Sequence, residues 1–222
     1  VPLFFDGQEI ALDFDFSSDD KMVQDQISRF LRDKCDFSVF RSVLEGDEPY
    51  AEAVWRGLSE MGVQGSAISG DYGGVDAGYL TLCLAARELG AHLAPVPFSS
   101  SIYLAAEAIS RYGSELQKET WLPKLAAGQV IGTLAVSESV LEPTSDSIAT
   151  TFANGKLTGI KLIVPHGLVA DVAIVLAKTD EGLSLVLTEL ENSQREKVDT
   201  VDPTMASATI EFSEVDAQVL GS

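Results

Sequence analysis

Basic side chains are scarce in this sequence of 222 residues, which has 15 lysines and arginines against 34 acidic residues and a formal net charge of −19. A nucleic-acid-binding protein needs a basic stripe that neutralises phosphates, and no such cluster is present, so nucleic acid is not an expected partner. Adsorption to an anionic membrane surface is disfavoured for the same reason. The acidity is typical of a well-solvated, self-repelling surface, although a dedicated cationic partner would also suit it.

Long apolar runs are absent as well. No run approaches the ~18–20 residues of a membrane span, and no basic segment followed by an apolar stretch indicates a signal peptide. The two cysteines, Cys35 and Cys83, lie in apolar helical patterns and are predicted to be small buried side chains rather than a disulfide or a metal pair. With 45% hydrophobic residues, the chain can bury a substantial core in one large domain or two ordinary ones. These features favour a cytoplasmic protein.

Residues 1–128 show apolar positions at helical spacing. The apolar residues from Val23 to Cys35 fall on one helix face, with Ser17 or Ser18 as the cap. Further helices are predicted over about 49–62, 80–90, 101–112 and 114–128. The last begins with Ser114-Glu115-Leu116-Gln117, which is a capping-box pattern. The first part of the chain is therefore predicted to be a helical bundle.

After Gly128 the pattern changes to short β-branched runs. Strands are predicted over 131–136, 148–152, 156–164, 172–177, 183–187 and 208–212. Asn154-Gly155 suits a two-residue hairpin turn because both positions accept positive φ. Several strands at short spacing without helices between them indicate an antiparallel barrel or sandwich. The predicted fold is thus α+β, with an N-terminal all-α helical domain over 1–128 and an antiparallel β-barrel or sandwich domain over 129–222.

No self-contained catalytic motif is present. The sequence contains no HExxH, CxxC or GxSxG pattern. The glycine loop over Gly70–Gly74 lacks the lysine and hydroxyl of a phosphate-binding loop. His92 is predicted to follow a helix end, where a cation complements the helix dipole. Composition and periodicity alone therefore leave the activity open.

The order of short motifs along the chain resembles the acyl-CoA dehydrogenase family. The central match is Gly113-Ser114-Glu115-Leu116-Gln117-Lys118 followed by Trp121-Leu122-Pro123-Lys124-Leu125-Ala126-Ala127-Gly128, where the family has G-S-E-x-Q-K and then L-P-x-L-A-x-G. Weaker matches lie on both sides, at Asp71–Gly74, Arg87–Gly90, Leu134–Glu138, Thr144–Asp146, Gly159–Lys161, Ala170–Asp171 and Ile210–Gly221. The resemblance extends over nearly the whole chain after about Asp13, and its helix-to-strand change falls at the expected place.

The resemblance implies a flavoprotein oxidoreductase that removes hydrogens from the α and β carbons of an acyl-CoA thioester with FAD as cofactor. It places Leu134, Val136 and Ser137 along the pyrimidine side of the flavin ring. It places Ile163, Val164 and Pro165 against the other part of the ring. Ser145 would lie near the path of the thioester and pantetheine. Without the resemblance, the four aliphatic residues among these would simply be core residues of the sheet.

Family members also have a C-terminal helical bundle that carries the catalytic glutamate and most of the oligomer interface, so no catalytic residue is assigned in this chain. The resemblance further implies an electron-transfer flavoprotein or similar acceptor, and homo- or hetero-oligomers of the full-length protein. An alternative is a non-catalytic, flavin-poor subunit of a heteromeric dehydrogenase. Ile163 and Pro165 favour it, because the family commonly has Trp and a hydroxyl residue at these positions. Acyl chain length is not predicted.

Overall fold

The structure is a computed structural model, and it describes residues 3–5, 8–10, 16–46, 48–139, 143–144 and 146–222. Side-chain environments are described from residue 16 onward. Within these ranges, no helix is both long and apolar enough to span a membrane.

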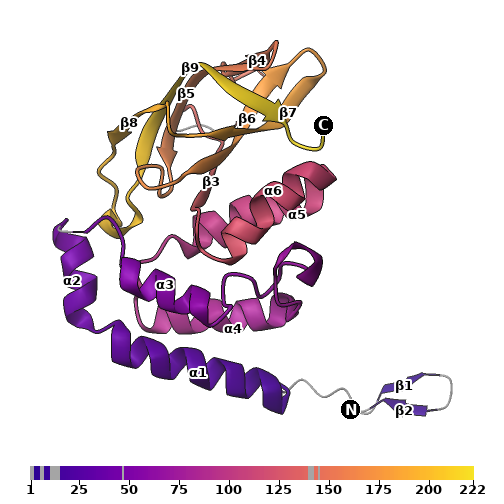
Figure 1. Ribbon diagram of the computed structural model, residues 1–222, viewed down its shortest axis with the longest axis vertical. Helices are drawn as coiled ribbons and strands as arrows, with labels where there is room; N and C mark the ends of the chain where they lie inside the picture. The colour runs from indigo at the N-terminus through magenta and orange to yellow at the C-terminus, as the bar shows by residue number, and fades with distance from the viewer. Residues whose placement is uncertain (1–2, 6–7, 11–15, 47, 140–142, 145) are drawn as a thin grey trace.

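The helices form a layer below the strands (Figure 1). The helix α1 is farthest from the strands, whereas α5 and α6 lie directly beneath them. The bounds are α1 Ser18–Lys34, α2 Phe37–Glu45, α3 Glu52–Glu60, α4 Gly78–Ala91, the π-helical segment η2 Ser99–Ala106, α5 Glu107–Tyr112 and α6 Glu115–Ala126. Two short 3-10 turns are η1 Gly70–Tyr72 and η3 Pro203–Met205.

Helix boundaries follow local capping chemistry. The Ser17 hydroxyl accepts the Asp20 N–H at 3.1 Å, and the Asp20 carboxylate accepts the Ser17 N–H at 3.2 Å, so the predicted cap of α1 is confirmed. Periodicity missed α2, because its apolar face is short and buries only Val43. Its two caps are nevertheless present in the sequence. The Asp36 carboxylate accepts the N–H groups of Ser38 and Val39 at the start of the helix, and Gly46 ends the helix with φ +88°.

The strands form one large sheet that closes on itself. They are β3 Gly132–Ala135, β4 Thr151–Ala153, β5 Lys156–Val164, β6 Val172–Thr179, β7 Gly182–Glu189, β8 Gln194–Lys197 and β9 Ala208–Val219; a separate pair is β1 Leu3–Phe5 and β2 Gln8–Ile10. Pairing runs from β6 through β7, β9, β5 and β4 back to β6. The last contact is a single residue pair, Thr151 with Lys178. The closed sheet confirms the predicted barrel.

Two of the pairings are parallel rather than antiparallel. The strand β6 is antiparallel to β7 along one edge, while β3 and β4 lie parallel to it. Register places β3 beside Val172–Val175 and β4 beside Lys178, so β3 and β4 follow one another along the second edge of β6. The predicted Asn154-Gly155 hairpin turn is confirmed, with φ values of +54° and +76°.

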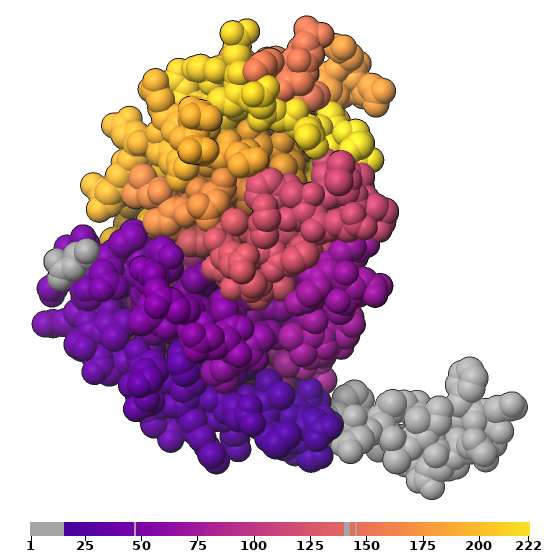
Figure 2. Space-filling view, viewed as in Figure 1, coloured from indigo at the N-terminus to yellow at the C-terminus, as the bar shows by residue number. Residues whose placement is uncertain are grey.

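The two layers meet tightly at the start of β3. The Ser101 hydroxyl of η2 accepts the Gly132 N–H at 3.1 Å, and both Ser100 and Ser101 are fully buried. A Cβ added to Gly132 would come within 2.5 Å of the Ala105 Cβ, so the backbone of β3 approaches η2 more closely than a side chain permits. Figure 2 shows the helical and strand parts in continuous contact along this face of the molecule. One apolar cluster accordingly includes buried residues of both parts.

The fold class agrees with the prediction, and several local details differ. The sequence patterns missed α2 and β8. Cys35 is buried as predicted, but the prediction for Cys83 is wrong: it is exposed, because α4 buries its neighbours Leu82 and Leu84. His92 is the C-cap of α4. The division at 128/129 stays a prediction; α6 ends at Ala126 and β3 begins at Gly132.

Candidate functional site

The ends of β3 and β5 lie side by side. Ser137 follows β3, and its carbonyl accepts the N–H of Leu162 in β5 at 2.8 Å. Nearer the helices, the Thr133 hydroxyl donates to the Pro165 carbonyl at 2.7 Å. These bonds bring Ser137 to the segment 162–165, so two motifs distant in the sequence lie side by side; Ser137 and residues 162–165 are called the candidate edge below.

A buried ion pair fixes this edge from within. The Lys161 ammonium is fully buried and donates to Glu138 Oε1 at 2.6 Å and to the Val136 carbonyl at 3.1 Å. The same Glu138 carboxylate accepts the N–H groups of Ala149 and Thr150 at 2.6 and 3.1 Å. Burial alone would raise the pKa of Glu138, but these hydrogen bonds, that from Lys161 first, lower the pKa to about 2. The pair therefore holds Val136 and Ser137 against β5.

Ile163 occupies an unusual backbone conformation. Its φ is +51°, a region that β-branched residues rarely adopt, and it lies where the register of β5 with β9 shifts between Lys161 and Val164. The side chain is 52% exposed. The Ile163 side chain is thus exposed one residue after Leu162, the partner of the Ser137 carbonyl, while Val164 stays in the core at 1% exposure.

The other predicted site residues lie around the same edge. Leu134, Val136 and Pro165 are half-buried, and Leu134 packs against the apolar cluster beneath the strands. Val164 can offer only backbone groups, because its side chain is buried. Ser145 lies outside the described residues. The structure therefore brings six of the seven predicted residues to one edge, and their roles stay predictions.

Sequence reasoning missed His166, which follows this edge directly. His166 is 3% exposed, and its Nδ1 lies 2.9 Å from the Ser100 hydroxyl of η2. Burial lowers its pKa to about 4, so the ring is neutral at neutral pH. No spacing rule links Ser100 to His166, because they are 66 positions apart and belong to different layers.

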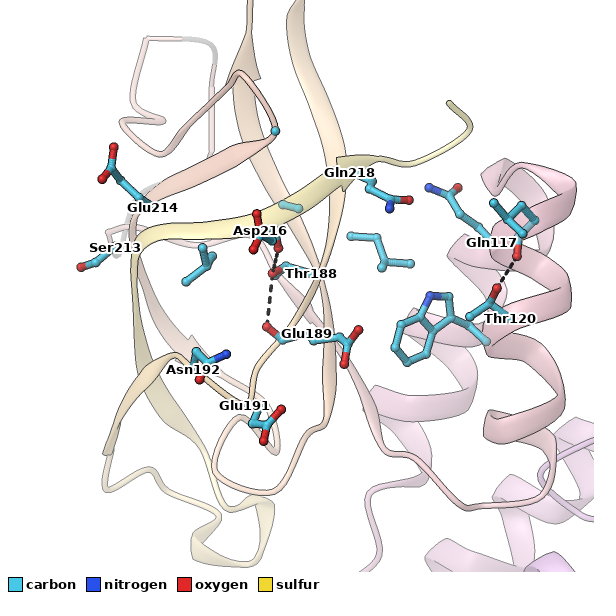
Figure 3. A pocket seen from close by; sticks show the side chains of 16 residues that line it. Gln117, Thr120, Thr188, Glu189, Glu191, Asn192, Ser213, Glu214, Asp216 and Gln218 are labelled. Atoms are coloured by element: carbon cyan, nitrogen blue, oxygen red, sulfur yellow. Dashed lines mark hydrogen bonds between the residues drawn. The ribbon is translucent and has the colours of Figure 1, made fainter.

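A wide groove opens elsewhere, between α6 and the strands β7 and β9 (Figure 3). Its volume is about 950 Å³, Gln117 of α6 lies across it from Glu189 and Asp216 of the strands, and Trp121 is among the lining residues. The lining also includes Glu191 and Glu214 but no lysine or arginine. Lys156 pairs with Asp216 from outside the lining, and the other three carboxylates still give the groove a negative charge that repels phosphates, so it does not suit CoA or FAD. No predicted site residue lines it.

The edge at Ser137 offers part of what a flavin ring requires. The ring is flat and apolar with a polar rim, and the candidate edge contains an exposed aliphatic side chain, Ile163, and the Ser137 hydroxyl. Within the described part of the chain, that hydroxyl makes no hydrogen bond. Pro165 adds neither an N–H nor a hydroxyl. The residues therefore fit the flavin at Ser137 and Ile163 and offer it less at Pro165.

A helical layer followed by a strand domain that closes into a barrel is the arrangement that the motif resemblance implies. The sequence model of the acyl-CoA dehydrogenase N-terminal domain matches residues 17–129, just over half of the chain. The chain belongs to the acyl-CoA dehydrogenase family.

Two curated relatives are named as dehydrogenases of CoA compounds. The chain is 32% identical over 141 residues to acyl-CoA dehydrogenase FadE27 of Mycobacterium tuberculosis, covering 64% of this chain and 38% of the relative. It is 30% identical over 196 residues to glutaryl-CoA dehydrogenase of Desulfococcus multivorans, covering 82% of this chain and 50% of the relative. The chain thus spans half or less of the length of these relatives.

Solved structures support the fold. An acyl-CoA dehydrogenase from Geobacillus kaustophilus superposes with a TM-score of 0.84 at 22% identity, covering 93% of this chain and 59% of that one. The ChsE4-ChsE5 complex from Mycobacterium tuberculosis gives a TM-score of 0.81 at 24% identity, covering 93% and 57%. At these identities the likeness establishes the architecture alone.

Proposed function

We propose that this chain provides the helical and middle strand domains, over 1–128 and 129–222, of an FAD-dependent acyl-CoA dehydrogenase. The main observation in support of the proposal is the hydrogen bond between the Ser137 carbonyl and the Leu162 N–H. This bond brings together the two segments in which the family resemblance places the flavin contacts. When bound, FAD accepts the β-hydride of the thioester. Ser137 would bind the polar rim of the ring, and Ile163 would cover part of its face.

The Ser137 hydroxyl is the group to test first. We expect Ser137→Ala to weaken FAD binding about two- to tenfold, since one hydrogen bond contributes ~0.5–1.5 kcal/mol. Titration of the protein with FAD, followed by flavin fluorescence, measures this. Ser213→Ala removes an exposed hydroxyl in β9 and serves as the matched control. Equal affinity of Ser137→Ala and wild type would contradict the placement.

Turnover is a separate matter from flavin binding. No residue of this chain is assigned as the base that removes the α-proton, and the chain spans half or less of its relatives. We expect the 222-residue chain alone to show no reduction of an electron-accepting dye with any acyl-CoA. Dye reduction above the no-enzyme background would show that the chain contains its own base.

The second candidate is a flavin-poor subunit of a heteromeric dehydrogenase. Ile163 and Pro165 favour it, because neither supplies the aromatic face or the hydroxyl that the family commonly has at these positions. Purification separates the two functions. A protein that carries FAD by itself supports the first, and a colourless protein that gains flavin only with a partner supports the second.

The remaining expectations concern partners and location. We propose an acyl-CoA thioester as substrate and an electron-transfer flavoprotein or similar acceptor as the electron partner, both by analogy with the family. Assembly into homo- or hetero-oligomers and a cytoplasmic location stay predictions. Size-exclusion chromatography with light scattering measures the assembly.

A further inference from the structure

The chain turns sharply between β5 and β6, directly after the candidate flavin edge. The turn covers 165–170 and is wound like the end of a helix: the N–H groups of Val169 and Ala170 both donate to the His166 carbonyl, at 3.0 Å. Such a turn leaves its last carbonyls without backbone donors. The turn keeps a single conformation only if donors from elsewhere in the chain bind these carbonyls.

Arg195 of β8 satisfies these carbonyls. Its Nη1 donates to the carbonyls of Ala170 at 2.8 Å and Leu168 at 3.2 Å, with a longer approach to Gly167 at 3.4 Å. Its Nη2 donates to the Leu190 carbonyl at 2.7 Å, just beyond β7. One guanidinium thus joins the turn to the end of another strand.

The surroundings make this contact difficult to replace. Ala170 and Leu190 are 1% and 0% exposed, so water does not readily take over their carbonyls. Within the described residues, Arg195 forms no ion pair with a carboxylate. The guanidinium is therefore held by hydrogen bonds to backbone carbonyls, with the Asp171 carboxylate as a more distant charge partner, and its planar group of five donors can span these carbonyls together.

The turn also holds the other half of the edge. The Asp171 carboxylate, next to Ala170, accepts the Ile131 N–H at 2.7 Å, and the Asp171 N–H donates to the Ile131 carbonyl at 2.7 Å. Ile131 precedes β3, the strand that leads to Ser137. A shift of the turn would therefore move both segments of the edge.

We propose that Arg195 is a positioning residue, which holds the 165–170 turn so that Ile163, Pro165 and Ser137 keep the geometry that receives the flavin ring. The part that concerns flavin rests on the proposed function. The bracing of the turn stands independently of it, on the four carbonyl contacts.

Amide hydrogen exchange tests the bracing without a cofactor. In Arg195→Ala we expect the amides of Leu168, Val169 and Ala170 to exchange about tenfold faster, because loss of the guanidinium frees the turn. The amides of Ala173 and Val175 in β6 should change less than about twofold, since their ladder is intact. Arg56→Ala, which removes an exposed arginine paired with Glu52, is the control. Uniform acceleration, or none, would overturn the proposal.

Rescue distinguishes a positioning role from general damage. Ethylguanidinium at millimolar concentration should restore slow exchange in Arg195→Ala, whereas ethylammonium should not, because only the former is planar and multidentate. If Arg195→Ala does not fold, Arg195→Lys replaces it: intermediate exchange confined to the turn supports the proposal, and wild-type exchange overturns it.

An FAD titration then tests the link to the edge. If wild type binds FAD, Arg195→Ala should bind it about tenfold more weakly and regain affinity with ethylguanidinium. Equal affinity would overturn the flavin part of the proposal. If wild type itself binds no FAD, the proposed function fails, while the exchange experiment still decides whether Arg195 braces the turn.

Discussion

Lys161→Met is expected to destabilise the protein by about 3–5 kcal/mol, because it leaves the Glu138 carboxylate buried without its cation. Methionine keeps most of the length of the side chain, so the loss reflects the charge rather than a cavity. Chemical denaturation measures the free energy of unfolding. The matched control is Lys156→Met: Lys156 pairs with Asp216 on the surface, with side chains 46% and 91% exposed, and such pairs contribute ~0–1 kcal/mol.

The pH dependence of the free energy of unfolding is a second test of the Lys161–Glu138 ion pair. The pKa of Glu138 lies at about 2 in the folded protein, below its ordinary value of about 4.5. Because folding lowers this pKa, the ionised Glu138 contributes its full stabilisation at pH values above the pKa of the unfolded chain. That stabilisation is lost as the pH falls from about 4.5 toward 2. Glu138→Gln should flatten this part of the profile. An unchanged profile, or similar losses for Lys161→Met and Lys156→Met, would show that the pair does not hold the edge.

Gly132→Val is expected to have the second largest effect, a loss of about 3 kcal/mol, the upper range for overpacking a core. An added Cβ at Gly132 would lie 2.5 Å from the Ala105 Cβ, and neither a helix backbone nor its first side-chain carbon can move aside cheaply. The contact lies where η2 meets β3, so the two layers should separate. Thermal unfolding followed by circular dichroism measures the loss.

The control for this substitution is Gly90→Ala. A Cβ at Gly90 meets nothing within 4 Å, and the residue lies near the end of α4. Alanine should therefore leave stability unchanged or raise it by ~0.5–1 kcal/mol. A Gly132→Val protein as stable as wild type would show that the layers are less closely packed than described.

Local patterns in the sequence predicted much of the fold. Apolar periodicity located α1, the pair Asn154-Gly155 located the first hairpin of the barrel, and the Ser114 pattern located the start of α6. In α6 the N–H of Ser114 donates to Gln117 Oε1 at 3.0 Å, as the capping box requires. The same Gln117 also donates to the Val219 carbonyl at 3.0 Å, a contact that no local pattern predicts.

The candidate site was predictable only in part. Motif order brought Ser137 and Ile163 into consideration, but the exposure of Ile163 comes from a register shift against β9. Lys161 and Glu138 are 23 positions apart, and their pairing depends on how β3 lies against β5. Sequence spacing describes neighbours on one element, whereas closure of a sheet decides which elements meet.

The parallel pairing of β3 with β6 also bears on the time course of folding. Residue Gly132 lies opposite Val172, so the strand partner of β3 lies about 40 positions later in the chain, beyond β4 and β5. Contacts between segments this distant form late, because the intervening loop must first be closed at an entropic cost. The segment that leads to Ser137 is therefore expected to pair with β6 after most local structure has formed.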